Sequence, residues 1–296
     1  MKVLHPGIRE GLETDLLAIR AVLLSGRLFG RERAELEDIF EEVSVHLRLE
    51  LDYLQEAANI ERFAQIYGND SRFCLPGTVP SHCSETVLTM GRVRGIGLDD
   101  FVASASEEDR QRAGLSLAQW FFESTFHHRL LHADPHPGNY LFGERGQVGV
   151  LDFGCVKEFD EFFLGSYART VRAALHGDRE ATLEACRDLG VWRGDSAGAG
   201  DAIWQFCDAV LSPWRGGPTV IGEEENLVTR VTPATRELWK YPEIRGARDM
   251  VYLHRTLGGL YTLARTLRVR ADWAEMLERH TTHAIDVAEG RVSRAS

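Results

Sequence analysis

The 296-residue sequence lacks the features that mark secreted or membrane-spanning chains. Its five cysteines are an odd number at unpatterned spacings without a Cys-x-x-Cys pair, and no signal peptide is recognisable. No apolar run approaches the roughly 18 residues of a spanning helix. We therefore expect structural or incidental thiols and a soluble, cytoplasmic chain, which an amphipathic helix could still hold peripherally at a membrane.

Basic side chains are also scarce: 34 face 45 acidic ones, which gives a net charge of −11. This balance argues against a nucleic-acid binder, which must neutralise a phosphate backbone, and gives no attraction to an anionic membrane surface. The content of 44% hydrophobic residues supports a substantial core. At roughly 100 to 200 residues per domain, the length allows two packed units.

The most informative pattern that is present joins the sequence HADPHPGN at 132–139 to LDFG at 151–154. An Asp, an Asn five residues later and a second Asp thirteen residues beyond form the layout of phosphoryl-transfer sites. Asp152 and Asn139 fit as magnesium ligands, because this hard cation prefers carboxylate and amide oxygens. Asp134 would face the acceptor hydroxyl as base or orienting carboxylate.

The segment between the two motifs predicts a β-hairpin. Residues 140–142 and 148–151 are short apolar strands, and residues 143–147 have turn chemistry. The ends of such a hairpin would bring Asn139 and Asp152 together, where a single ion could join them.

Two less favoured interpretations apply to the same region. His132, Asp134 and His136 alternate and lie near His127 and His128, so a transition-metal site is the alternative to a nucleotide site. The thiol of residue 155 follows the Asp-Phe-Gly sequence and could line the site, although a small buried thiol is the favoured interpretation.

Apolar periodicity predicts a mainly helical chain with strand-like text between residues 74 and 93 and a boundary near 91–97. In the second helix the expected apolar stripe runs through Phe40, Val43, Leu47, Leu51, Leu54 and Ala58. The expected helices cover 8–25, 32–66, 107–130, 160–176, 179–189, 200–211, 223–239, 246–268 and 271–289.

The late segment Leu253–Tyr261 contains the paired glycines Gly258 and Gly259 on a strongly periodic helix. Each glycine weakens a helix by about 1 kcal/mol relative to Ala, so the pair is expected to permit the close approach of another helix. A binding function for Arg255 is the less favoured alternative.

These motifs together give the chain a specific resemblance to the UbiB (AarF-type) family of atypical protein-kinase-like proteins. The matching segments are KVLHPGIR at 2–9, ELDYLQEAAN at 50–59, the motifs at 132–139 and 151–154, and the segment at 253–261. The resemblance implies an α+β, protein-kinase-like two-lobe fold. Residues 1–94 would form an incomplete small lobe with a long helix, and residues 95–296 a mainly helical large lobe.

Residue roles follow from the resemblance. Lys2 matches the strand lysine that pairs with triphosphate oxygens, and Glu56 matches the helix glutamate that holds this lysine. Glu50 and Asp52 match a regulatory acidic pair that meets a lysine-containing motif of an N-terminal extension in relatives. Met90, at the lobe hinge, belongs with the nucleotide-binding residues.

The resemblance also matches Asp134 to the catalytic Asp, and Asn139 and Asp152 to the two magnesium ligands. It implies ATP and magnesium as cofactors, and a kinase or ATPase that supports isoprenoid-quinone (ubiquinone) biosynthesis or lipid handling with lipid or quinone-biosynthesis partners. One alternative is a non-catalytic pseudokinase or scaffold. Another is a small-molecule phosphotransferase of the aminoglycoside-kinase type, against which the segment at 50–59 argues.

The start of the sequence departs from the family pattern. Relatives place an N-terminal extension, an alanine-rich nucleotide loop and at least two strands before the lysine, whereas only Met1 precedes Lys2 here. We expect an exposed strand edge at Lys2–Leu4. A start recorded too far downstream or a completing second polypeptide is favoured over a genuinely short form, and activity is expected of the full-length or completed protein.

Overall fold

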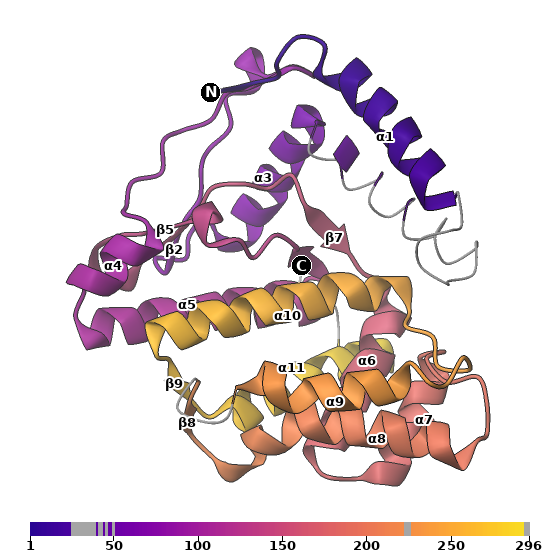
Figure 1. Ribbon diagram of the computed structural model, residues 1–296. Helices are drawn as coiled ribbons and strands as arrows, with labels where there is room; N and C mark the ends of the chain where they lie inside the picture. Colours follow the sequence, from indigo (N-terminus) through magenta and orange to yellow (C-terminus); the bar gives the residue numbers. More distant parts are fainter. Residues whose placement is uncertain (25–39, 41–43, 45–46, 49–50, 222–225, 293–296) are drawn as a thin grey trace. The chain divides into compact units, whose positions relative to one another are not determined.

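The computed structural model describes residues 1–24, 40, 44, 47–48, 51–221 and 226–292, which fall into two compact units (Figure 1). Unit 1 comprises Met1–Arg94 and Gly149–Val156, and unit 2 comprises Gly95–Val148 and Lys157–Ser296. The assignment of lobes made from the sequence stays a prediction. Each unit is described by itself.

Unit 1 places Lys2 on a short paired strand. Strand β1 (Lys2–Val3) pairs antiparallel with β3 (Val87–Leu88), with Lys2 opposite Leu88. The Leu4 amide extends the pairing by donating to the Thr86 carbonyl at 2.9 Å. Within the described residues this sheet has two strands, so β1 has the open edge that was expected. The other regular elements of unit 1 are α1 (Ile8–Leu24), α3 (Tyr53–Tyr67), β2 (Phe73–Cys74) and the 3₁₀ turn Pro80–His82.

Helix α3 begins later than expected. The prediction of a continuous helix over 32–66 is wrong for its described part, because Leu51 lies in a turn and Asp52 is the N-cap. The Asp52 carboxylate accepts the backbone N–H of Gln55 at 3.0 Å, which satisfies one of the amides left open at a helix start. Most of 32–50, including Glu50, lies outside the described residues.

The buried face of α3 also differs from the expected apolar stripe. Leu54 is 48% exposed and Ala58 is exposed, so the part of the stripe that lies on α3 does not face the core. The buried face carries two polar residues as well as apolar ones: Glu56, Ala57, Asn59, Ile60, Phe63 and Tyr67. A helix that buries polar side chains needs partners for them, and these partners form part of the candidate site.

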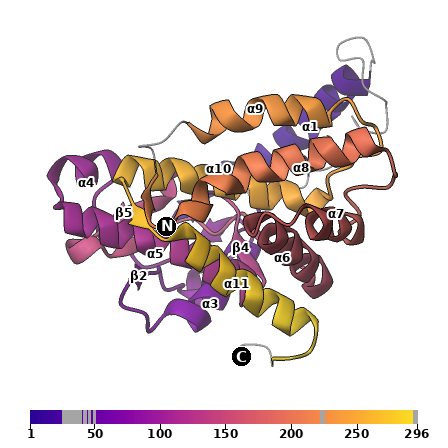
Figure 2. The same ribbon diagram turned by 90° about the horizontal axis from the view of Figure 1, so that it is seen from below.

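Unit 2 is mainly helical. Helices α5 (Glu107–Phe126) and α10 (Arg248–Leu267) lie side by side (Figures 1 and 2). The other helices are α4 (Leu98–Ser104), α6 (Glu161–Leu175), α7 (Arg179–Asp188), α8 (Ala197–Leu211), α9 (Leu227–Leu238) and α11 (Trp273–Ala288). The short strands of unit 2 are β4 (Leu130–His132), β5 (Tyr140–Phe142), β8 (Thr219–Val220) and β9 (Arg270–Ala271), and 3₁₀ turns span Pro137–Asn139, Glu144–Gly146 and Ser212–Gly216. Strands β6 (Val148–Val150) and β7 (Val156–Glu158) each contain residues of both units.

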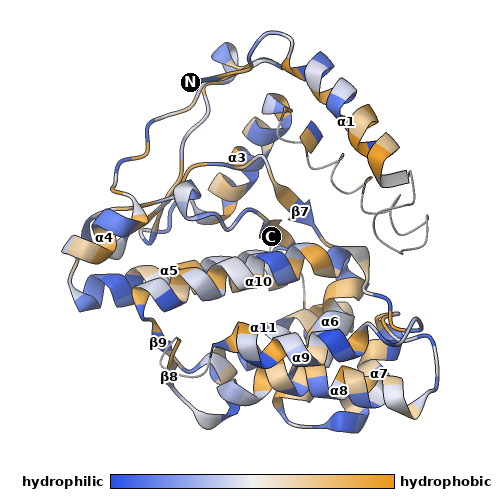
Figure 3. Cartoon of the chain, viewed as in Figure 1, coloured by the Kyte–Doolittle hydropathy of each residue, from blue (hydrophilic) through white to orange (hydrophobic). Residues whose placement is uncertain are grey.

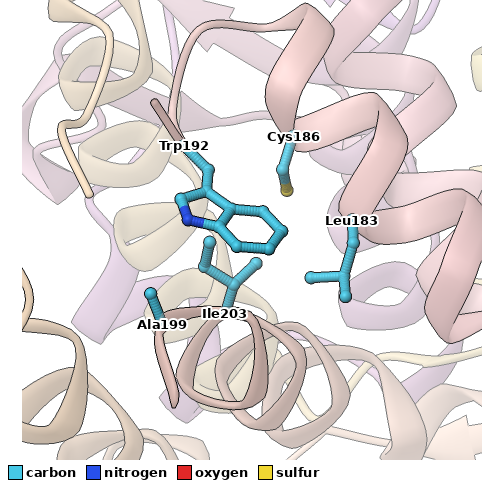
Figure 4. Packing of buried hydrophobic residues seen from close by; sticks show 5 residues of the cluster. All are labelled: Leu183, Cys186, Trp192, Ala199 and Ile203. Atoms are coloured by element: carbon cyan, nitrogen blue, oxygen red, sulfur yellow. The ribbon is translucent and has the colours of Figure 1, made fainter. Parts of the chain in front are cut away.

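A hydrophobic cluster joins α7 to α8 in unit 2 (Figure 4). Leu183 and Cys186 of α7 meet Ala199 and Ile203 of α8 around the Trp192 indole. Helix α8 begins at Ala197 rather than at 200, because the Ser196 hydroxyl accepts the Ala199 N–H at 3.2 Å and caps the helix earlier. The five cysteines are all free thiols.

The predicted hairpin is confirmed. Its strands are β5 and β6, and the turn is closed by the Gly143 N–H, which donates to the Gln147 carbonyl at 2.8 Å. The turn requires glycine at 146, where φ is +72° and an added Cβ would lie 2.5 Å from the Asp109 carbonyl oxygen. The chain passes from unit 2 to unit 1 within β6.

The helices of the described segments are amphipathic or short. Figure 3 shows apolar and polar residues mixed along them, with apolar residues gathered toward the C-terminal end of α1. None of the described helices is both long enough and apolar enough to cross a bilayer.

Candidate active site

Unit 1 brings three of the predicted site residues together. The Lys2 Nζ donates to Glu56 Oε1 at 2.5 Å and to Asp152 Oδ2 at 2.7 Å. The Glu56 side chain is 3% exposed, whereas those of Lys2 and Asp152 are 29% and 38% exposed. The sequence had indicated a Lys2–Glu56 pair, but it gave no sign that Lys2 also contacts Asp152.

The cluster combines one ammonium with two carboxylates, and these groups shift one another's pKa values. Burial opposes the charge of Lys2, but hydrogen bonds to Asp152 and Glu56 outweigh it and raise the pKa of the ammonium. Burial raises the pKa of the Glu56 carboxyl, the negative Asp152 adds to this shift, and the hydrogen bond from Lys2 opposes it. Two carboxylates around one ammonium leave an excess negative charge, which favours a further cation.

Helix α3 also holds the backbone of the Asp-Phe-Gly sequence. The Phe153 N–H donates to Glu56 Oε1 at 3.3 Å, and Asn59 Nδ2 donates to the Phe153 carbonyl at 2.9 Å. Asp152 Oδ1 accepts the Gly154 N–H at 2.9 Å. No role for Asn59 was predicted from the sequence. Its spacing of three residues from Glu56, which places both on one helix face, is the signal that could have found it.

The residues next to this backbone are buried. The Phe153 ring is fully buried and packs on Phe63 with ring centroids 5.4 Å apart. Cys155 is 6% exposed, which agrees with the favoured interpretation of a small buried thiol.

Unit 2 brings two further predicted site residues together. Strand β4 leads into the loop that carries Asp134, and a 3₁₀ turn ends at Asn139. Asn139 Nδ2 donates to Asp134 Oδ2 at 2.6 Å and to the Asp134 carbonyl at 3.3 Å. Because a carboxylate only accepts, the amide nitrogen must face it, and the amide oxygen of Asn139 points away from this bond.

Helix α10 packs directly on the loop that carries Asp134. Arg255 Nη2 donates to the Ala133 carbonyl at 2.6 Å. A Cβ added at Gly259 would lie 2.3 Å from Cβ of Pro135, whereas one at Gly258 meets no described atom within 4 Å. The expected close approach therefore exists at Gly259, but its partner is this loop and not another helix, because the loop presents a bulky proline ring to α10.

The transition-metal alternative is wrong for the described part of the chain, where no three His, Cys, Asp or Glu side chains could share an ion. His132 is 2% exposed, while His136 is exposed and its Nδ1 accepts the Gly138 N–H at 3.0 Å. The alternating residues thus do not face one way. His127 instead meets His280, with Nε2 and Nδ1 2.9 Å apart.

The remaining predicted residues occupy separate places. Met90 forms an isolated antiparallel bridge with Thr78 in unit 1 and is half-buried. Asp52 caps α3, and Glu50 lies outside the described residues. The expected meeting of Asn139 and Asp152 stays a prediction, because they belong to different units.

The donor atoms present suit magnesium better than a softer metal. Asp152 offers a carboxylate and Asn139 an amide oxygen, both of which are hard ligands. Magnesium commonly takes only one or two protein carboxylates and completes its shell with water and substrate phosphates. The Asp152 carboxylate in unit 1 and the Asn139 amide in unit 2 are each a donor of the kind that magnesium takes.

Comparisons with known proteins identify the family. A model of the ABC1 atypical kinase-like domain matches residues 1–186. The mitochondrial atypical kinase COQ8 of Schizosaccharomyces pombe is 26% identical over 293 residues, covering 97% of this chain and 47% of that protein. Mitochondrial atypical kinase COQ8B of Rattus norvegicus is 30% identical over 195 residues, covering 64% and 36%.

A solved structure agrees at the level of the fold. Rv3197 of Mycobacterium tuberculosis, in complex with erythromycin, matches with a TM-score of 0.68 and 22% identity, covering 96% of this chain and 71% of that one. The chain belongs to the ABC1 atypical kinase-like family of UbiB type, and its α+β, kinase-like fold is confirmed. It spans less than half the length of these curated relatives.

Proposed function

We propose that this chain, as a member of the ABC1 atypical kinase-like family, binds ATP with magnesium and takes part in an atypical kinase or ATPase reaction. The observation that carries the proposal is the position of the Lys2 ammonium between Glu56 and Asp152 in unit 1. A lysine and two carboxylates gathered from three distant segments are hard to explain by packing alone. Phosphoryl-transfer sites need this combination to fix a cation beside phosphate oxygens.

Lys2 would bind phosphate oxygens of the nucleotide. Its ammonium has three donors, of which Glu56 and Asp152 take two among the described residues. Glu56 fixes the flexible lysine stem, since the buried carboxylate and the ammonium hold each other in place. The raised pKa of Lys2 keeps it charged for this role.

Asp134 would orient the acceptor hydroxyl and accept its proton. The bond from Asn139 Nδ2 occupies Oδ2 and fixes the carboxylate plane, which leaves Oδ1 for the hydroxyl. Asp152 and the amide oxygen of Asn139 would hold magnesium, which supplies positive charge to the phosphate oxygens when bound.

The wider role follows from the family. We propose that ATP turnover supports isoprenoid-quinone biosynthesis or lipid handling, with peripheral membrane association. The isoprenoid-quinone content of source cells with and without an intact gene tests this role. Unchanged content after deletion would remove the quinone assignment and leave lipid handling.

The direct test is Mg-ATP binding followed by turnover. Wild-type protein is expected to show an increase in thermal midpoint with Mg-ATP, and Asp152→Asn is expected to lose most of this increase together with ATP hydrolysis. Glu85→Gln is the matched control, because Glu85 is an exposed acid of unit 1 that pairs with Arg9 away from the cluster.

The outcomes separate the candidate functions. Stabilisation by Mg-ATP without turnover in the longest form of the protein would indicate a pseudokinase. Unchanged hydrolysis in Asp152→Asn would remove the metal role of Asp152. Phosphorylation of a soluble hydroxyl compound would favour the small-molecule phosphotransferase.

A further inference from the structure

Asn59 is a buried polar residue on a helix whose partners explain its position. It is 3% exposed and lies within α3, where an unpartnered amide would be costly. Both ends of the amide are engaged: Nδ2 donates to the Phe153 carbonyl at 2.9 Å and Oδ1 accepts from Gln55 Nε2 at 3.1 Å. A backbone carbonyl only accepts, so Nδ2 must face Phe153.

Asn59 and Glu56 together hold both polar groups of one residue. Glu56 Oε1 accepts the Phe153 N–H at 3.3 Å, and Asn59 binds the carbonyl of the same residue. The two side chains lie one helical turn apart, so the spacing of α3 matches the spacing of the backbone groups. Phe153 is thus held much as a neighbouring strand would hold it, although its partner is a helix.

The Phe153 backbone directly follows Asp152, the proposed metal ligand, and directly precedes Gly154. Asp152 is joined to the Phe153 nitrogen, and its carboxylate contacts Lys2 through Oδ2 and Gly154 N–H through Oδ1. The Phe153 N–H bond fixes the peptide group that joins Phe153 to Asp152. The second bond, from Asn59, fixes the peptide group that joins Phe153 to Gly154, whose N–H binds the Asp152 carboxylate.

We infer that Asn59 is a positioning residue for Asp152, which fixes the magnesium-binding carboxylate through the carbonyl of Phe153. The inference rests on the proposed function for the identity of the ligand. It rests on unit 1 alone for its geometry, because every residue in this chain of contacts belongs to that unit.

The test compares Asn59→Leu with Gln55→Leu. Leu has the same branched side-chain shape as Asn, with bulkier methyl groups, but donates no hydrogen bond, so the Phe153 carbonyl loses the bond from Asn59. Gln55→Leu removes a neighbouring bond to Asn59 but leaves the bond to Phe153 in place. Asn59→Ala, which leaves room for water at the carbonyl, is the second variant if Asn59→Leu does not fold.

The first readout is hydrogen exchange of the ligand-free protein. The Phe153 and Gly154 amides are expected to exchange about tenfold faster in Asn59→Leu, and within about threefold of wild type in Gln55→Leu. Unchanged exchange at these amides would overturn the inference. Uniformly faster exchange throughout unit 1, or failure of both Asn59 variants to fold, would also overturn it by indicating a purely structural role.

The second readout is the magnesium concentration that gives half-maximal thermal stabilisation at fixed ATP. It is expected to rise about tenfold in Asn59→Leu, while stabilisation by ATP without magnesium stays at the wild-type level. An equal magnesium requirement in variant and wild type would overturn the inference. If the wild type itself is not stabilised by Mg-ATP, the proposed function fails, and the exchange result still decides whether Asn59 positions Asp152.

Discussion

The predicted site residues form two clusters, the unit 1 half and the unit 2 half of the proposed site, which hold their carboxylates over very different chain distances. In unit 1, Asp152 contacts Lys2 across 150 positions, and the Phe153 N–H reaches Glu56 across 97. In unit 2, Asp134 is held by Asn139, five positions away in the same loop. The unit 1 half therefore forms only when α3 and β1 pack correctly, whereas the unit 2 half is closed by local turn geometry.

Their surroundings differ in a second way. The unit 1 half is a charged cluster around a buried glutamate, while the unit 2 half is a loop supported by Arg255 and Gly259 of α10. Removing a charged side chain should weaken the unit 1 half most. Adding side-chain atoms where α10 contacts the loop should weaken the unit 2 half most.

Replacing Lys2 by Met should give the largest loss. Mg-ATP binding is expected to weaken by about 100-fold, since the phosphates lose their cation. The free energy of unfolding should fall by on the order of 2 kcal/mol, below the value for a fully buried pair because Lys2 is 29% exposed. Urea unfolding and thermal-shift titration with Mg-ATP measure both changes.

The control for this loss is the double variant with Glu56→Gln. It removes the uncompensated buried charge, so it should regain most of the stability without regaining nucleotide binding. Wild-type binding by Lys2→Met would refute the charged half-site.

Replacing Gly259 by Ala should disturb the unit 2 half through space alone. Its Cβ would lie 2.3 Å from Pro135, so the loop with Asp134 must shift. Turnover in the longest active form is expected to fall on the order of 10- to 100-fold, because a displacement of about 1 Å misaligns the acceptor. ATP hydrolysis and the thermal midpoint are measured together.

Gly258→Ala is the matched control, since its Cβ meets no described atom within 4 Å. It should leave turnover unchanged and could stabilise α10 by up to about 1 kcal/mol. Equal losses in the two variants would show that contact with Pro135 does not explain the effect of Gly259→Ala.

Replacing Asp52 by Ala should have a smaller effect on unit 1. The variant loses the cap of α3 and should cost about 1 kcal/mol of unfolding free energy, measured by urea denaturation. Asp52→Asn keeps the side-chain acceptor and should cost less than half as much. If Asp52→Asn instead changes nucleotide binding with little change in stability, the predicted regulatory role outweighs capping.

The smallest effect at neutral pH concerns the histidines of unit 2. Burial and the neighbouring charges of His283, His280, His128 and Arg279 lower the pKa of His127 to about 3, and burial together with Arg279 and His283 lowers that of His280 to about 4. Between the ordinary histidine pKa near 6.5 and these values, the unfolded chain binds protons that the folded chain does not. Unfolding free energy should therefore fall as the pH drops through this window.

His127→Gln should reduce this acid sensitivity while leaving stability at neutral pH nearly unchanged. Urea denaturation at several pH values between 3 and 7 provides the measurement. If the unfolding free energy of the variant depends on pH as strongly as that of the wild type, the lowered pKa of His127 is contradicted.

Predictions from local sequence were correct where neighbouring residues determine the geometry. The closeness of Asp134 and Asn139 and the turn at 143–147 could both be predicted, because a loop and a hairpin close within a few residues. The pairing of Lys2 with Glu56 came from the family resemblance and not from periodicity.

Periodicity failed on α3 for a physical reason. The expected stripe was based on the spacing of hydrophobic residues alone, so it included Leu54 and Ala58, which are exposed. The helix instead buries Glu56 and Asn59, which is favourable because Lys2 and the Phe153 backbone satisfy them. Such partners come from distant segments and leave no local pattern.

The chemical groups of this protein, the family to which its motifs point, and the local turns that carry Asp134 and Asn139 can all be predicted from the order of its residues. The contacts of Lys2 with Asp152 as well as Glu56, of Asn59 with Phe153, and of Gly259 with Pro135 arise only when the chain has folded. Short-range geometry follows from backbone sterics and turn chemistry. Contacts between distant segments depend instead on how whole elements pack, and packing satisfies buried polar groups that no single segment can satisfy alone.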